Sequence, residues 1–204
     1  MTTEETLRQI KQSFRLIMDG VTSQSMREKG AGYHLNWGAN ILHLREMAKE
    51  YTPDYHVAMA LWKENIRECK IMATLLMPHD QFTTDIALLW IEQTPTPEIA
   101  EMASMNLYRH LPYAKDLALQ LIAQNVECVQ FYGYCILSWL FSDIEKAAES
   151  LTESELNEFI DQAKTAFDTQ NITLKHKIQN AVIKFSNISD LHYSMANSAG
   201  FWGN

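Results

Sequence analysis

The chain has 204 residues, of which 47% are hydrophobic, seven are glycine and five are proline. Glycine and proline form the turns that join short strands, so this low content argues against a β-sandwich or a β-barrel. The net charge of −8, from 17 basic and 25 acidic residues, argues against unspecific binding to polyanions and leaves only a local basic patch for nucleic acid.

Hydrophobic residues recur at helical spacing from the N-terminus onward. This period predicts a first helix at about 4–18, with Gly20 just past its end, and a second helix at about 37–50. Residues 20–36 between them are the least regular stretch. Pro53 opens the next region, because proline is tolerated in the first turn of a helix but not in its interior. Two apolar helical segments follow it.

The helical period continues to the C-terminus. The pair Thr96–Pro97 predicts an N-cap followed by a proline in the first turn, and Thr152 with Glu155 has the spacing of a capping box. The segment 126–141 is apolar on almost every side, which predicts a buried helix. Two more helices are expected, at 172–187 and from Ser189 onward.

These segments add up to about nine helices, in pairs that recur every 30–45 residues or so. That spacing is typical of HEAT-like arrays, in which each helix pair buries its apolar face against its neighbours. We therefore predict one all-α domain over residues 1–204, a HEAT-like helical-repeat superhelix. The repeats share no visible consensus, so an irregular helical bundle fits the periodicity almost as well.

Signatures of cofactor and metal chemistry are missing from the sequence. It has no glycine-rich phosphate loop, no HExxH, no GxSxG and no dinucleotide fingerprint. Its seven histidines are scattered and its three cysteines lack CxxC spacing, so we expect no metal and no cofactor. The N-terminus is acidic and amphipathic and the longest apolar stretch, 131–141, is too short to span a bilayer. We expect a cytoplasmic protein with no membrane partner.

Residues 26–78 resemble the DNA alkylation repair family, HEAT-like DNA glycosylases that excise alkylated, cationic bases. The resemblance depends on the MREKG start, the NWG turn and above all the block LW-x4-RE-x3-MATLL, which contains Trp62, Arg67 and Glu68. It implies an α-helical superhelix that cradles duplex DNA by its backbone, without metal or cofactor. It also implies base release assisted by a carboxylate and by aromatic faces, which stabilise positive charge on the deoxyribose.

The resemblance places four positions of this chain at the family's catalytic residues. Pro97 falls at a tryptophan, Glu101 at the catalytic aspartate, Phe131 at an arginine and Ala181 at a second tryptophan. At three of the four positions the side chain differs in chemical type from the family's residue, so whether the chain is an enzyme stays open. Glu101 is the one catalytic candidate, although a solvated glutamate near the start of a helix is the more common role.

Local charge suggests the phosphate contacts. The residues expected to bind nucleic acid are Arg45, Arg67 and Lys70, with Lys175 and Lys177 as a second edge. Lys184 belongs to the same C-terminal basic cluster, whereas Trp62 and the aromatic residues of 131–141 are expected to pack in the core.

Two functions therefore remain. The first is a DNA alkylation repair-like protein that recognises alkylated duplex DNA and hydrolyses the N-glycosidic bond of cationic bases weakly. The second is a non-catalytic helical-repeat scaffold that binds a protein or peptide in its groove.

Overall fold

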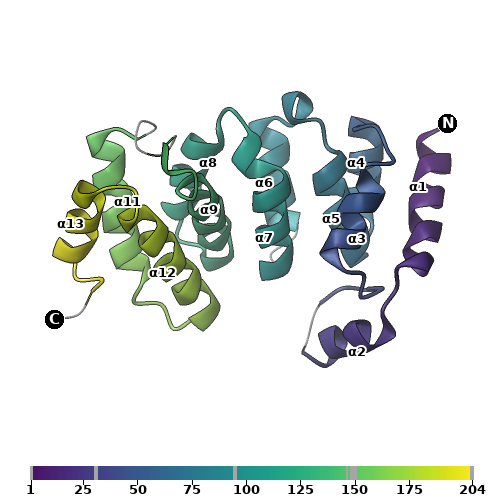
Figure 1. Cartoon of the computed structure of the whole chain (residues 1–204), viewed down its shortest axis with the longest axis horizontal. Helices are drawn as coiled ribbons and strands as arrows, with labels where there is room; N and C mark the ends of the chain where they lie inside the picture. Colours follow the sequence, from purple (N-terminus) through teal and green to yellow (C-terminus); the bar gives the residue numbers. More distant parts are fainter. Residues whose placement is uncertain (1, 30–31, 94–95, 146, 148–150, 203–204) are drawn as a thin grey trace. The chain divides into compact units, whose positions relative to one another are not determined.

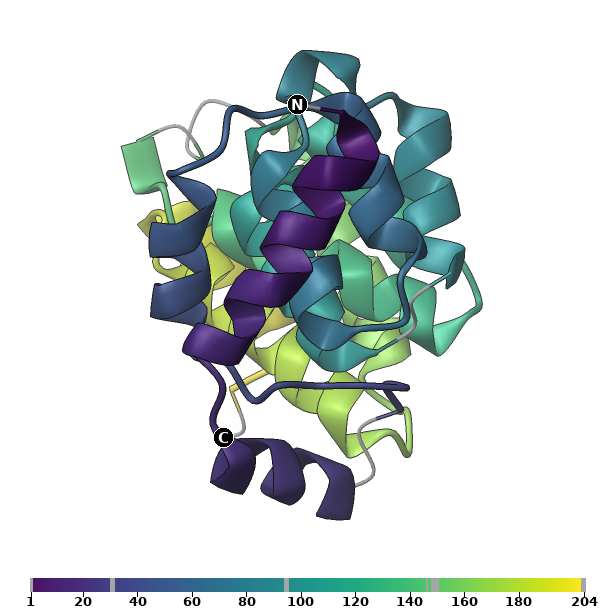
Figure 2. The same cartoon turned by 90° about the vertical axis from the view of Figure 1, so that its right-hand side faces the viewer.

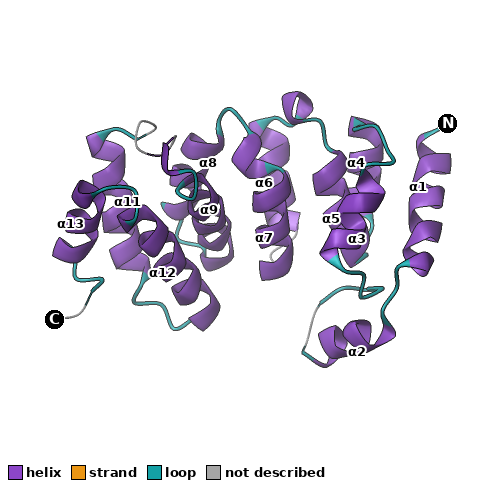
Figure 3. Ribbon diagram, viewed as in Figure 1, coloured by secondary structure: helices purple, strands orange, loops and turns teal. Residues whose placement is uncertain are grey.

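The computed structural model describes residues 2–29, 32–93, 96–145, 147 and 151–202. Within these residues the helices are joined by loops, with twelve α-helices, three 3₁₀ turns and no strand (Figures 1 and 3). The prediction of an all-α fold is confirmed, and the expected number of about nine helices is too low. The chain divides into two compact units, Met1–Thr83 and Thr84–Asn204, which are described separately below. A single domain over 1–204 stays a prediction.

Unit 1 contains the first five helices. They are α1 (Thr3–Ser13), α2 (Gly20–Glu28), α3 (Ile41–Ala48), α4 (Tyr55–Lys63) and α5 (Arg67–Leu76). Helix α5 packs against both α3 and α4, and α1 lies against α4, as Figure 2 shows with α1 in front. The core between them includes Ile10, Phe14, Leu61 and Trp62, so the predicted burial of Trp62 is confirmed.

Two helix boundaries in unit 1 differ from the prediction because of local capping. The first helix ends at Ser13, and Gly20 is the first residue of α2, not a residue beyond the end of α1. The carboxylate of Asp19 accepts the N–H groups of Val21 and Thr22 and so begins α2 inside the stretch expected to be irregular. Likewise, the second predicted helix begins at Ile41, because Asn40 is extended and its side chain caps α3 by accepting the N–H of Leu42.

Unit 2 contains seven described α-helices. They are α6 (Thr84–Gln93), α7 (Pro97–Asn106), α8 (Ala114–Ile122), α9 (Glu127–Leu140), α11 (Glu153–Ala166), α12 (Ile172–Ser186) and α13 (Asp190–Ser198). Helix α9 is central, because α7, α8 and α12 all pack against it, and its residues Phe131–Ser138 are all buried. The predicted buried helix and the capping box at Thr152 are therefore confirmed.

Aromatic rings from three segments form the centre of the C-terminal part of unit 2. The ring of Phe159 on α11 lies 5.0 Å from Phe141, after α9, and 4.9 Å from Phe185 on α12. Such edge and tilted contacts contribute about 0.5–1.5 kcal/mol per pair beyond the area they bury. This cluster fixes α12 against α9 and so positions the polar side chains that α12 presents at its surface.

Candidate functional site

The NWG turn and the Arg67–Glu68 pair of unit 1 form one buried unit. The Glu68 carboxylate is fully buried and accepts the backbone N–H of Trp37 at 3.0 Å and of Ala39 at 3.2 Å. The Arg67 guanidinium donates to Glu68 at 3.0 Å and to the Ala39 carbonyl at 2.9 Å. These two motifs are far apart in sequence but join in space, so their function here is to fold unit 1.

Gly38 is required in this turn for both conformation and space. Its φ is +68°, which favours glycine, and a Cβ there would lie 2.2 Å from the Asp19 carbonyl oxygen. The turn therefore packs directly on the start of α2.

The three basic residues predicted to bind DNA in unit 1 lie in different environments. Arg67 is only 3% exposed, and Lys70 donates to the Trp62 carbonyl while its Nζ lies 4.5 Å from the centre of the Trp62 ring. Burial lowers the pKa of Lys70. Arg45 is half-buried on α3. The phosphate contacts of all three stay predictions, and burial makes Arg67 and Lys70 poor donors to a DNA backbone.

In unit 2, three of the positions suggested by the resemblance meet where α7, α9 and α12 pack together. Glu101 on α7 forms an ion pair with Lys177 on α12. The Lys177 ammonium also lies 5.9 Å from the centre of the Phe131 ring on α9. Ala181 is buried one turn further along α12. A cation therefore does stand beside the candidate carboxylate, but α12 supplies it and not α9.

Lys184 adds a second cation to the same place. It lies seven residues after Lys177, about 10.5 Å along the same face of α12. Burial lowers the pKa of Lys184, and the nearby charge of Lys177 lowers it further, whereas Glu101 acts in the opposite direction. Glu101 is thus paired with Lys177 and acts on Lys184 only through its charge. Nearby, the buried thiol of Cys135 has a pKa well above its usual value, because of burial first and then the charge of Glu101.

Trp139 continues this surface toward the end of α9. Its half-buried indole is contacted by Lys184, at 5.1 Å from the ring centre, and by Arg109, at 4.6 Å. Arg109 and Trp139 also line a pocket of about 560 Å³. Cations placed over an indole are held by its π face. We call Glu101, Arg109, Trp139, Lys177 and Lys184 the cation surface.

Sequence reasoning found only part of the cation surface. Glu101 was predicted as a catalytic residue and Lys177 as a DNA contact, and the structure brings the two together. Lys175, predicted beside Lys177, points elsewhere and lies 4.8 Å from the centre of the Phe167 ring. The spacing of seven residues between Lys177 and Lys184 could have shown that they share a face. No local signal could have shown that Arg109 joins them at Trp139.

No three His, Cys, Asp or Glu side chains in the part of the chain that the structure describes gather as metal ligands would. None of its helices has both the length and the apolar character needed to cross a bilayer.

Comparison with known proteins places the chain in a family. The model of the family described as DNA alkylation repair enzyme matches residues 10–130, more than half of the chain. A solved structure matches 95% of this chain and 81% of its own, with a TM-score of 0.84 and 13% sequence identity. It represents a family related to the HEAT-like repeat DNA glycosylases with affinity for branched DNA structures.

At 13% identity the structural likeness shows the fold alone, and it confirms the predicted HEAT-like helical repeats. No curated protein sequence matches the chain. The family model covers the MREKG, NWG and LW-x4-RE-x3-MATLL motifs together with α7, where Glu101 lies. The chain belongs to the DNA alkylation repair enzyme family.

Proposed function

We propose that this protein recognises DNA that carries alkylated bases, that it contacts the DNA backbone through the cation surface, and that it hydrolyses the N-glycosidic bond only weakly. The observation that carries the proposal is the placement of Lys184 and Arg109 over the Trp139 indole, next to the ion pair of Lys177 with Glu101. Membership of the family supports it, as does the affinity of the structural relative for branched DNA.

Backbone contact suits the cation surface because two of its cations are held in place and, among the described residues, are not used in ion pairs. Lys177 is paired with Glu101, whereas neither Lys184 nor Arg109 forms an ion pair with a residue that the structure describes, although Asp143 lines the pocket beside Arg109. The indole of Trp139 and the ring of Phe131 fix the directions of these cations. Because few phosphates are neutralised, binding is expected to be weak and steeply salt-dependent, with a slope of log affinity against log salt of about −3.

Weak hydrolysis follows from the pairing of Glu101. In the reaction the N-glycosidic bond breaks, its electrons pass to the cationic base, and water adds to C1′ and loses a proton. A carboxylate assists by stabilising positive charge on the sugar. Lys177 neutralises much of that effect at Glu101, and neither Pro97 nor the buried Ala181 offers a π face to the sugar.

DNA binding is tested by fluorescence anisotropy of labelled duplex, with and without 7-methylguanine, over a range of salt concentrations. Lys184→Gln and Arg109→Gln should each weaken binding and reduce the salt slope by about 1. Lys164→Gln is the matched control, since Lys164 is an exposed lysine of the same unit on α11, away from the cation surface. An equal loss in all three variants would contradict the proposed surface.

Hydrolysis is tested by single-turnover release of 7-methylguanine from duplex DNA at saturating protein. We expect slow release by the natural protein, none above buffer in Glu101→Gln, and an altered rate in Glu101→Asp. Lys177→Gln should release the base faster than the natural protein, because it frees the carboxylate. Rapid release that survives Glu101→Gln would show that the active site lies elsewhere.

A second candidate function, a scaffold for a protein partner, is favoured by one feature of unit 1. A groove of about 680 Å³ is lined by Leu16 and Met18, which are 86% and 55% exposed. Apolar side chains exposed together in a groove are typical of protein contacts. Absence of binding to any DNA at low salt, with the fold intact by circular dichroism, would favour this function over DNA recognition.

A further inference from the structure

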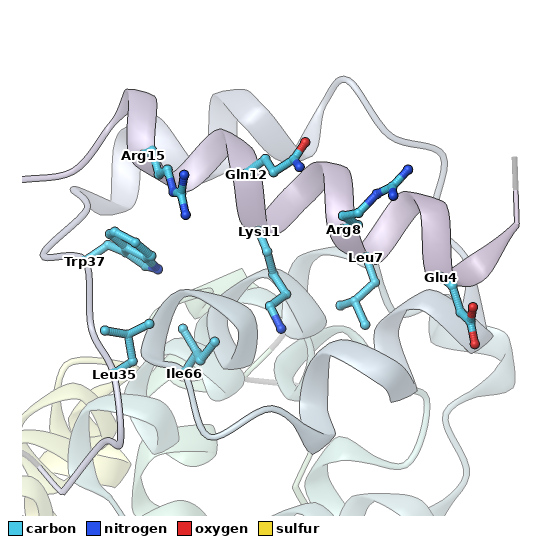
Figure 4. A pocket seen from close by; sticks show the side chains of 9 residues that line it. All are labelled: Glu4, Leu7, Arg8, Lys11, Gln12, Arg15, Leu35, Trp37 and Ile66. Carbon is cyan, nitrogen blue, oxygen red and sulfur yellow. The ribbon is translucent and has the colours of Figure 1, made fainter.

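A second pocket lies within unit 1, far in sequence from the cation surface (Figure 4). Its volume is about 300 Å³, and α1 forms one side of it. The opposite side is formed by Leu35, Trp37 and Ile66. Leu35 and Ile66 are joined by a β-bridge, so this wall is anchored to the start of α5. The pocket therefore combines an aromatic ring, an apolar floor and one helix face.

That helix face carries an unbalanced positive charge. Arg8 and Lys11 of α1, and Arg15 of the 3₁₀ turn Phe14–Leu16 that follows it, all line the pocket. Lys11 is paired with Glu64 at 3.0 Å. Arg8 and Arg15 are exposed, and neither forms an ion pair with a residue that the structure describes. The guanidinium groups of Arg8 and Arg15 thus remain available to anions.

Trp37 is fixed in place independently of any ligand. Its backbone N–H donates to Glu68 at 3.0 Å, and its carbonyl accepts the N–H of Asp19 at 2.9 Å. The indole is half-buried, and Figure 4 shows it at the same end of the pocket as Arg15, with Glu4 at the other end. A half-buried ring on a fixed backbone loses less conformational entropy than a fully exposed one when a flat ligand stacks on it.

We infer that this pocket binds an unpaired nucleotide of a single-stranded DNA end. The base packs against Trp37, and the adjoining phosphates lie near Arg15 and Arg8. An aromatic ring beside a row of cations is the arrangement with which proteins bind single strands. The carboxylate of Glu4 repels phosphate at the far end, and so it sets the direction in which the strand leaves. The volume of about 300 Å³ lies at the lower end of the range of small-molecule sites, which suits a single base.

This inference depends on the proposed function only in taking DNA as the ligand, and it adds what part of a DNA structure is recognised. Two binding sites, one for backbone and one for an unpaired end, favour DNA with a junction or an overhang over a continuous duplex. The relative's affinity for branched DNA is compatible with that preference.

The test compares a labelled blunt duplex with the same duplex carrying a five-nucleotide overhang of thymidines, by fluorescence anisotropy. The natural protein should bind the overhang about tenfold more tightly, the effect of one stacked base. Trp37→Leu and Arg15→Gln should each remove this preference and leave blunt-duplex binding unchanged, and Trp37→Phe should retain most of it. Lys63→Gln, at an exposed lysine of α4 outside the pocket, is the control.

The two proposals fail in different ways. Lys184→Gln should weaken blunt and overhang DNA equally, so a loss restricted to the overhang identifies the α1 pocket. Binding of labelled (dT)5 alone, sensitive to Arg15→Gln, would sustain the inference even if the blunt duplex does not bind. The inference is overturned if Arg15→Gln keeps the overhang preference, or if hexaglutamate displaces (dT)5 as well as unlabelled (dT)5 does. Circular dichroism confirms that each variant is folded.

Discussion

Replacing Glu68 by glutamine should destabilise unit 1 strongly, although the two side chains have almost the same shape. The carboxylate is fully buried and receives three hydrogen bonds, from the Trp37 and Ala39 backbone and from Arg67. Glutamine can accept some of these bonds, but it removes the negative charge that lies 3.0 Å from the guanidinium of Arg67, whose side chain is 4% exposed. Breaking one partner of a buried ion pair costs about 3–5 kcal/mol.

Glu64→Gln is the matched control for this prediction. The Lys11–Glu64 pair belongs to the same unit and has the same N–O distance, 3.0 Å, as the Arg67–Glu68 pair. Its side chains are 37% and 29% exposed, so water screens the pair and its loss should cost about 1 kcal/mol or less. The two variants thus differ in burial and in the two backbone hydrogen bonds that Glu68 accepts.

Urea unfolding followed by circular dichroism measures both free energies of unfolding. Hydrogen exchange adds a local measurement, because the amides of Trp37 and Ala39 should exchange faster in Glu68→Gln and at the natural rate in Glu64→Gln. The reasoning is refuted if the two variants lose equal stability, or if those amides keep their protection when Glu68 is replaced.

Three further predictions concern stability and are measured by urea unfolding. Trp62→Ala should lower the free energy of unfolding by about 3–5 kcal/mol, because the side chain is 1% exposed and its loss leaves a cavity. An unchanged urea midpoint would show that the site collapses or is solvated. Gly133→Ala should lower the free energy of unfolding by about 1–3 kcal/mol, since the new Cβ would lie 2.9 Å from the Ala118 carbonyl oxygen. Gly20→Ala is the control and should not destabilise the protein, because a Cβ added at Gly20 would have no atom within 4 Å. Glu155 is bonded to Lys115 at 2.6 Å, and that hydrogen bond first, then the Thr152 backbone N–H, lowers its pKa to about 2. Its contribution of about 1 kcal/mol to the free energy of unfolding is therefore present above about pH 4.3 and is lost as the pH falls toward 2. A loss of stability in Glu155→Gln that is the same at pH 7 and at pH 2 would contradict this.

The sequence alone predicted the features that depend on neighbouring residues. The helical period, the capping box at Thr152 and the burial of α9 are all local, because the spacing of three and four residues decides which side chains share a helix face. The burial of Trp62 follows from its position on such an apolar face. The family resemblance also came from contiguous motifs, since the residues that fold unit 1 lie in short blocks.

Only the tertiary structure decided which polar residues meet. The sequence grouped Arg67 and Lys70 with the DNA contacts because of their charge, but their directions depend on the NWG turn and on Trp62, which lie on other segments. It treated Glu101 as a lone carboxylate, and the packing of α7 and α12 on α9 gives it Lys177 as a partner. Helical periodicity tells which residues of one helix share a face, but not which helix covers that face. That second choice is made by the packing of the whole core, and it determines the cation surface.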